Sequence, residues 1–215
     1  ADPLADAEVI LLGSSIFERF GLKDVRLEIN SIGCPECRAK YLEALKAYFE
    51  QYRGELCPTC LERLDKNPMR ILDCKSPVCG KIAEGAPKVL DYLCGDCQEH
   101  FDGVKTLLDA AGVPYRVNPS IVRGLDYYTR TVFEFLAPID GKELAVCAGG
   151  RYDGLIEELG GQSMPALGFG LGMERLLLLL KQQSVELPGA DPCEIFIASL
   201  GQPAKLAAFR LCDTL

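Results

Sequence analysis

The cysteines are the residues whose spacing most clearly suggests chemistry. Eight of the eleven form four close pairs: Cys34/Cys37, Cys57/Cys60, Cys74/Cys79 and Cys94/Cys97. Two thiolates on one tight turn can reach the same tetrahedral ion, so the spacing predicts structural zinc. We expect one site from Cys34, Cys37, Cys57 and Cys60 and a second from Cys74, Cys79, Cys94 and Cys97. An interleaved grouping, or reduced thiols without metal, are the alternatives.

A second candidate is the run RGLDYYTRTVFEF, Arg123 to Phe135. It places arginines and two adjacent tyrosines on a turn that leads into a strand. Neighbouring side chains of an extended chain point to opposite faces, so one of Tyr127 and Tyr128 would pack while the other offers its hydroxyl to a pocket. A surface turn with an aromatic anchor is the alternative.

A third candidate is GFGLGMERL, Gly168 to Leu176. Gly168, Gly170 and Gly172 would share one face of a strand and leave a floor without side chains, on which a planar ligand can lie. Arg175 falls in the first turn of the next helix, where a cation is unfavourable unless an anion such as a phosphate binds there. A strand kinked for close packing is the alternative.

The run AGGRYDGL, Ala148 to Leu155, could bring Arg151 and Tyr152 into the same pocket. The only histidine is His100, so a catalytic triad or a histidine-based zinc protease site would have no base elsewhere in the sequence. We interpret His100 as a solvated helix position, with a substitute metal ligand as the alternative.

Composition narrows the class of protein. The 215 residues are 48% hydrophobic and 25% charged, which is typical of a globular chain, and the net charge of -8 argues against a broadly basic nucleic-acid surface. The longest apolar run, Leu176–Leu180, is far shorter than the roughly 20 residues a bilayer needs. We expect a cytoplasmic protein that does not enter a membrane, and a chain that is a fragment of a longer one.

Periodicity predicts an α+β fold with a mostly helical, cysteine-rich insertion. Apolar residues repeat with helical spacing over 4–20, 35–53, 97–111, 152–159 and 173–182. Strand-like segments are 25–29, 115–117, 131–136, 144–148, 167–171 and 194–199. We expect catalytic core at 1–30 and 118–187, the insertion at 31–117, and a linker with the start of another domain at 188–215.

With RGLDYYTRTVFEF, AGGRYDGLIEELGG and PALGFGLGMERLLLL, the sequence resembles the class II histidyl-tRNA synthetase family along essentially its whole length. RGLDYYTRTVFE is similar to the family's histidine signature and GFGLGMERL to class II motif 3. The resemblance implies an antiparallel-sheet catalytic core that activates histidine with ATP and Mg²⁺ and transfers it to tRNA(His), in a homodimer.

The resemblance also implies a role for each matching residue. Arg123 would act on the α-phosphate and the histidine carboxylate, and Tyr127, Tyr128 and Tyr152 would line the histidine pocket. Arg175 would hold ATP above the floor formed by Gly168, Gly170 and Gly172. Glu134 would face the phosphates and Mg²⁺.

The sequence departs from the family pattern in two ways. Motif 1 and the motif 2 arginine are not among these residues, so we expect the fragment alone to be inactive. The cysteine pairs are not a general feature of the family, so any zinc is expected to be structural. The alternatives are a synthetase-like regulatory subunit of histidine biosynthesis and a zinc-stabilised tRNA-binding module.

Overall fold

The computed structural model describes residues 1–121, 127–186, 189 and 193–214. The chain divides into two units, Ala1–Val185 and Glu186–Leu215, which we describe separately. The boundary lies close to the expected linker.

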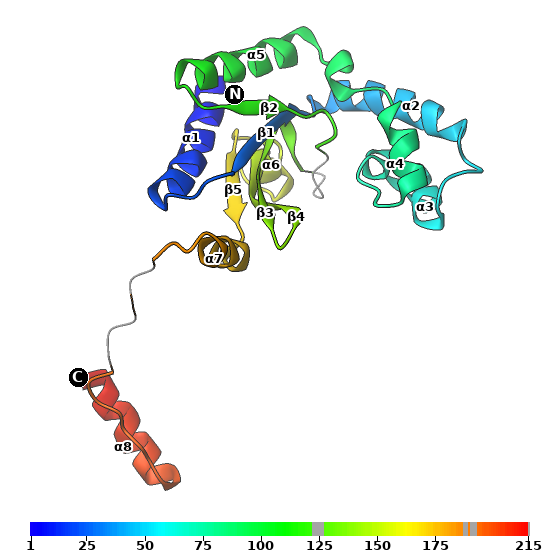
Figure 1. The fold of residues 1–215 in the computed structure, drawn as a ribbon. Coiled ribbons are helices and arrows are strands. Elements are labelled where there is room, and N and C mark those ends of the chain that lie inside the picture. Colours follow the sequence, from blue (N-terminus) through cyan, green and yellow to red (C-terminus); the bar gives the residue numbers. More distant parts are fainter. Residues whose placement is uncertain (122–126, 187–188, 190–192, 215) are drawn as a thin grey trace. The chain divides into compact units, whose positions relative to one another are not determined.

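The first unit is built on a five-stranded sheet with the order β2-β1-β3-β4-β5 (Figure 1). The strands are β1 (Arg26–Ser31), β2 (Tyr115–Val117), β3 (Thr129–Ile139), β4 (Lys142–Arg151) and β5 (Leu167–Leu171). Only β1 and β2 are parallel, and the other three pairs are antiparallel. The expected α+β fold with a mainly antiparallel sheet is confirmed.

Three helices cover one face of this sheet: α1 (Pro3–Arg19), α5 (Gly95–Ala110) and α7 (Met173–Gln182). Alternate apolar residues of the strands, such as Ile29, Phe133 and Phe135, pack with buried side chains of these helices in one core. The start of α1 is fixed locally, because Asp2 accepts a hydrogen bond from the Leu4 N–H at 2.9 Å and Pro3 occupies the first helical position.

The cysteine-rich segment forms a separate helical cluster, seen to one side of the strands in Figure 1. It contains α2 (Pro35–Glu50), α3 (Pro58–Lys66) and α4 (Pro77–Glu84), with short 3₁₀ helices η1 (Pro68–Ile71) and η2 (Val89–Tyr92). Proline at the first position of α2, α3 and α4 presets the helical backbone there. A second core includes Tyr41, Leu45, Phe49, Leu64 and Ile71 of this cluster, and it extends to Tyr128 and Val132 at the sheet.

Two elements within the expected insertion, 31–117, pack with the sheet: α5 and β2. Helix α5 packs against α1 and contributes Phe101, Val104 and Leu108 to the core beneath the sheet, and β2 pairs with β1. Helical periodicity shows which face of α5 is buried, but it cannot show which partner buries that face. The helical cluster therefore ends near Cys94.

The second unit contains helix α8 (Gly201–Thr214). The strand expected at 194–199 is wrong, because this segment has no regular structure and its apolar side chains, including Ile195 and Phe196, are exposed. A strand needs a neighbour for its backbone hydrogen bonds, and the described part of this unit provides none. The other expected elements exist, although the helix expected at 152–159 is reduced to α6 (Leu155–Glu158).

Candidate functional site

The sheet face opposite α1, α5 and α7 carries the residues that could bind a ligand. Strand register aligns Glu28, Glu134, Ala148 and Gly170 across four strands, so these residues share that face. The neighbouring row consists of Asn30, Val132, Gly150 and Gly168. Between β4 and β5 the floor therefore consists of glycine and alanine only.

The glycines of this face differ in what surrounds them. A Cβ at Gly170 would meet no atom within 4 Å, whereas a Cβ at Gly168 would lie 2.9 Å from the Tyr152 hydroxyl oxygen. At Gly150, a Cβ would lie 2.6 Å from the Thr131 carbonyl oxygen and 2.9 Å from a Tyr128 ring carbon. The floor is thus covered by tyrosines at one end and open at Gly170.

Three tyrosines form this cover. The ring centroids of Tyr127 and Tyr128 are 4.7 Å apart, and those of Tyr127 and Tyr152 are 5.6 Å apart. The expectation that Tyr127 and Tyr128 point to opposite faces is wrong, because β3 begins only at Thr129 and Tyr127 lies in a turn. All three tyrosines expected in the histidine pocket are consequently brought together.

Arg175 lies beyond the other end of the glycine floor. It is exposed in the first turn of α7, and its Nη1 donates a hydrogen bond to the Ala145 carbonyl at 2.5 Å. Gly172 is the N-cap of α7, and a Cβ there would lie 3.7 Å from the Arg175 side chain. The expected position of Arg175 at a helix N-terminus beside the glycines is confirmed.

Two carboxylates lie in the row of Gly170. Glu28 is buried and accepts hydrogen bonds from Arg26 Nε at 3.0 Å and Asn118 Nδ2 at 2.5 Å. Glu134 is half-buried on the adjacent strand. Sequence reasoning missed Glu28, which an acidic residue between Leu27 and Ile29 on an apolar strand could have indicated.

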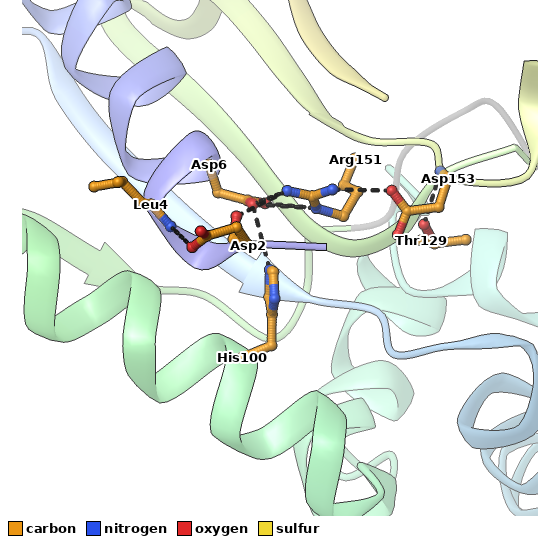
Figure 2. Close-up of polar contacts among 7 residues, drawn as sticks. All are labelled: Asp2, Leu4, Asp6, His100, Thr129, Arg151 and Asp153. Carbon is orange, nitrogen blue, oxygen red and sulfur yellow. Dashed lines mark hydrogen bonds and ion pairs between the residues drawn. The ribbon is translucent and has the colours of Figure 1, made fainter. Parts of the chain in front are cut away.

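A buried ion-pair network surrounds Arg151, the residue that precedes Tyr152 in the sequence (Figure 2). Arg151 Nε donates to both Asp6 carboxylate oxygens at 3.2 and 3.1 Å, its Nη2 donates to Asp6 as well, and its Nη1 donates to Asp153 at 2.9 Å. His100 Nε2 lies 3.4 Å from Asp6 Oδ2, an ion-pair distance without hydrogen-bond geometry. Burial raises the pKa of Asp6, but His100 and Arg151 outweigh it, so the pKa lies below its usual value.

This network corrects two expectations. Arg151 is 1% exposed and ties the end of β4 to α1, so it does not reach into the ligand pocket. His100 is 5% exposed and faces Asp6, so it is neither solvated nor a metal ligand. Asp6 and Arg151 are 145 residues apart in the sequence, and no local pattern could have paired them.

The eight paired cysteines form two groups of four in the structure. Cys34 and Cys37 lie with Cys94 and Cys97, and Cys57 and Cys60 lie with Cys74 and Cys79; within each group the sulfur atoms are within 4.8 Å of one another. The expected grouping in sequence order is therefore wrong. The outer pairs meet because the chain leaves the sheet after β1 and returns beside it through α5, which brings the two ends of the insertion together.

Arg123 lies outside the described residues. No helix in the part of the chain that the structure describes is long and apolar enough to cross a membrane.

Comparison with known proteins decides the family. The sequence profile described as histidyl-tRNA synthetase matches residues 1–176. This chain belongs to the histidyl-tRNA synthetase family. The resemblance of the motifs to that family is therefore confirmed.

Individual members of the family support this assignment. The histidine–tRNA ligase of Caldicellulosiruptor saccharolyticus is 54% identical over 213 residues, which are 99% of this chain and 51% of the relative. That of Clostridium botulinum strain Kyoto is 50% identical over 214 residues. The chain spans about half the length of the curated relatives it matches.

Solved structures agree with the fold. Apo histidyl-tRNA synthetase of S. aureus is 38% identical, with a TM-score of 0.71 over 100% of this chain and 53% of that one. A Bacillus halodurans protein described as an ATP phosphoribosyltransferase regulatory subunit/histidyl-tRNA synthetase is 22% identical with a TM-score of 0.55, and it supports the fold alone.

Proposed function

We propose that this chain is the part of a histidine–tRNA ligase that binds histidine and the adenosine of ATP. The complete enzyme activates histidine to histidyl-adenylate and transfers it to the 3′ end of tRNA(His), as a cytoplasmic homodimer. The observation that carries the proposal is the sheet face on which the glycine floor runs from a cover of three tyrosines to Arg175. Family membership and the names of the curated relatives favour a ligase over a regulatory subunit or an RNA-binding module.

The chemistry suits such a site. The histidine carboxylate attacks the α-phosphorus of ATP, and pyrophosphate leaves. This step needs no protein nucleophile; it needs positioning and stabilisation of the charge that spreads over the phosphoryl oxygens. Tyrosines that hold the imidazole ring, and a floor that lets adenine lie close to the backbone, would fix both reactants.

The charged residues take the electrostatic roles. Arg175 would pair with a phosphate of ATP, and Arg123 would act at the α-phosphate and the substrate carboxylate. Glu134 lies in the row of Gly170, where its carboxylate suits the Mg²⁺ that accompanies ATP.

The glycine floor offers a direct test. In a complete ligase that carries this segment, Gly170→Val should lower kcat/KM for ATP by about tenfold or more, equivalent to about 1.4 kcal/mol. The Cβ of the new side chain would meet no protein atom within 4 Å, and the side chain would enter the space assigned to the nucleotide. The measurement is histidine-dependent exchange of pyrophosphate into ATP.

Gly54→Val is the matched control, because a Cβ at this exposed turn glycine also meets nothing within 4 Å, and the glycine lies in the helical cluster away from the floor. Both variants should fold. An unchanged kcat/KM in Gly170→Val would contradict the assignment of the floor to ATP.

A further inference from the structure

Four helices of the chain begin in the same way. Each has a cysteine in its first turn, three residues after the N-cap: Cys37 in α2, Cys60 in α3, Cys79 in α4 and Cys97 in α5. The N-caps of α2, α3 and α5 are themselves cysteines, Cys34, Cys57 and Cys94, and the N-cap of α4 is Ser76, which follows Cys74 by two residues. Each group of four sulfurs therefore lies between two helix N-termini.

The spacing of the sulfurs fits a tetrahedral ion. A Zn–S distance of about 2.3 Å requires sulfurs about 3.8 Å apart. Cys34 Sγ and Cys37 Sγ are 3.5 Å apart in one group, and Cys57 Sγ and Cys74 Sγ are 3.9 Å apart in the other. A disulfide would require about 2.05 Å, and all eight cysteines are free.

The backbone around both groups of cysteines stabilises the thiolate form that binds a metal. The backbone N–H of Cys94 donates to Cys37 Sγ at 3.1 Å in one group, and that of Cys57 donates to Cys79 Sγ at 3.3 Å in the other. The Ser76 N–H donates to Cys74 Sγ at 3.4 Å. Together with the positive ends of two helix dipoles, such donors compensate the net charge of -2 of an ion bound by four thiolates.

We propose that the chain binds two structural zinc ions in a nested arrangement, an outer clasp and an inner clasp. The outer clasp consists of Cys34, Cys37, Cys94 and Cys97. The inner clasp consists of Cys57, Cys60, Cys74 and Cys79. All four cysteines of a clasp bind the ion as thiolates, so each Zn²⁺ displaces the protons that the four thiols still carry.

The two clasps act on different parts of the molecule. The outer clasp joins the start of α2, just after β1, to the start of α5. It therefore holds together the two ends of the helical cluster, where the cluster meets the sheet. One turn along α5, His100 faces Asp6, which Arg151 holds against β4. The inner clasp joins α3 to α4 within the cluster. Loss of the outer ion therefore loosens α5 beneath the sheet, and loss of the inner ion leaves that helix in place.

Zinc counting in double variants tests the nesting. Protein purified without chelator should contain two zinc ions per chain by elemental analysis. Cys37→Ser with Cys97→Ser removes two ligands of one clasp and should leave one ion. Cys37→Ser with Cys60→Ser disables both clasps and should leave none. Grouping in sequence order predicts the reverse, and grouping Cys34/Cys37 with Cys74/Cys79 predicts no ion in the first variant.

Cys193→Ser with Cys212→Ser is the matched control, because both cysteines are exposed outside the two groups, and it should retain two ions. Fewer than two ions in the unmodified chain would overturn the proposal. So would iron with inorganic sulfide, or a mass lower by two hydrogens per disulfide.

A titration with cobalt requires no variant. In the unmodified chain loaded with Co²⁺ in place of zinc, absorption bands of tetrahedral thiolate coordination should reach their maximum at two equivalents of metal.

Amide hydrogen exchange distinguishes the structural effect of the outer clasp from that of the inner clasp. Cys97→Ser should speed exchange by about tenfold or more over the first turns of α5, whereas Cys60→Ser should do so only in α3 and α4. Equal effects of both variants on α5 would overturn the distinct role of the outer clasp.

Discussion

At the scale of single residues, the contact between Asp6 and Arg151 shows why an arginine next to the candidate site need not bind a ligand. Both side chains are 1% exposed, and each needs the other because an isolated buried charge is very costly. Arg151 Nη1 also donates to Asp153, and Nη2 donates to the Asp2 carbonyl. Arg151 therefore fixes the end of β4, from which Tyr152 continues into the candidate site.

Asp6→Asn should lower the free energy of unfolding by about 3–5 kcal/mol at pH 7, because it leaves Arg151 buried without its main counter-ion. The pKa of Asp6 is lower in the folded than in the unfolded chain, so its stabilisation is present above about pH 4 and is lost as pH falls through the folded pKa. Urea unfolding at pH 7, 5 and 3 should show the difference between wild type and variant shrinking only at the lowest pH.

Asp153→Asn is the comparison variant for this measurement. Asp153 contacts Arg151 through one oxygen, and its side chain is 27% exposed, so the loss should be smaller. A loss equal to or greater than that of Asp6→Asn would contradict the central role assigned to Asp6.

At the scale of elements, α5 belongs to the sheet and not to the helical cluster that precedes it. Its buried face, which includes Phe101, Val104 and Leu108, packs into the same core as α1 and the strands. The cysteines at its start nevertheless face the cluster. Helix α5 therefore connects the two cores, and a change on its buried face should act on the sheet.

Leu108→Ala should reduce stability by about 2–5 kcal/mol and speed amide exchange in α1 and the central strands. Leu64→Ala, at an equally buried position of the helical cluster, is the matched variant and should speed exchange mainly in α2, α3 and η1. If Leu108→Ala affected the helical cluster more than the sheet, the assignment of α5 would be wrong.

At the scale of the whole molecule, the 215 residues supply only some of the groups that the proposed reaction would need. The glycine floor, the tyrosine cover and Arg175 are local to strands β3–β5 and the helix after them. The family resemblance implies that the motif 2 arginine, which would act on the opposite side of the triphosphate, is not among these residues. Charge that develops in the transition state would thus be stabilised from one side only.

We therefore expect the isolated 215-residue chain to catalyse no measurable histidine-dependent exchange of pyrophosphate into ATP. A complete histidine–tRNA ligase assayed in parallel is the control. A rate within about tenfold of that enzyme, a barrier difference of less than about 1.4 kcal/mol, would show that this half of the site suffices.

The features that the sequence alone could predict are those that depend on residues close together in the chain. Alternating apolar residues place β3, β4 and β5, and helical periodicity places α1, α2 and α7, because these signals act within a few residues. The motifs at Tyr127–Tyr128 and Gly168–Gly172 indicate the face proposed to bind ligand for the same reason. The α+β class follows from these elements.

Only the tertiary structure decided which distant residues meet. The grouping of Cys34 and Cys37 with Cys94 and Cys97 depends on how the chain returns to the sheet through α5 and β2, and the Asp6–Arg151 contact depends on α1 packing against β4. The burial of His100 depends on α5 leaving the helical cluster. Each of these contacts joins residues far apart in the chain, where the free energy of packing, and not local backbone preference, selects the partner.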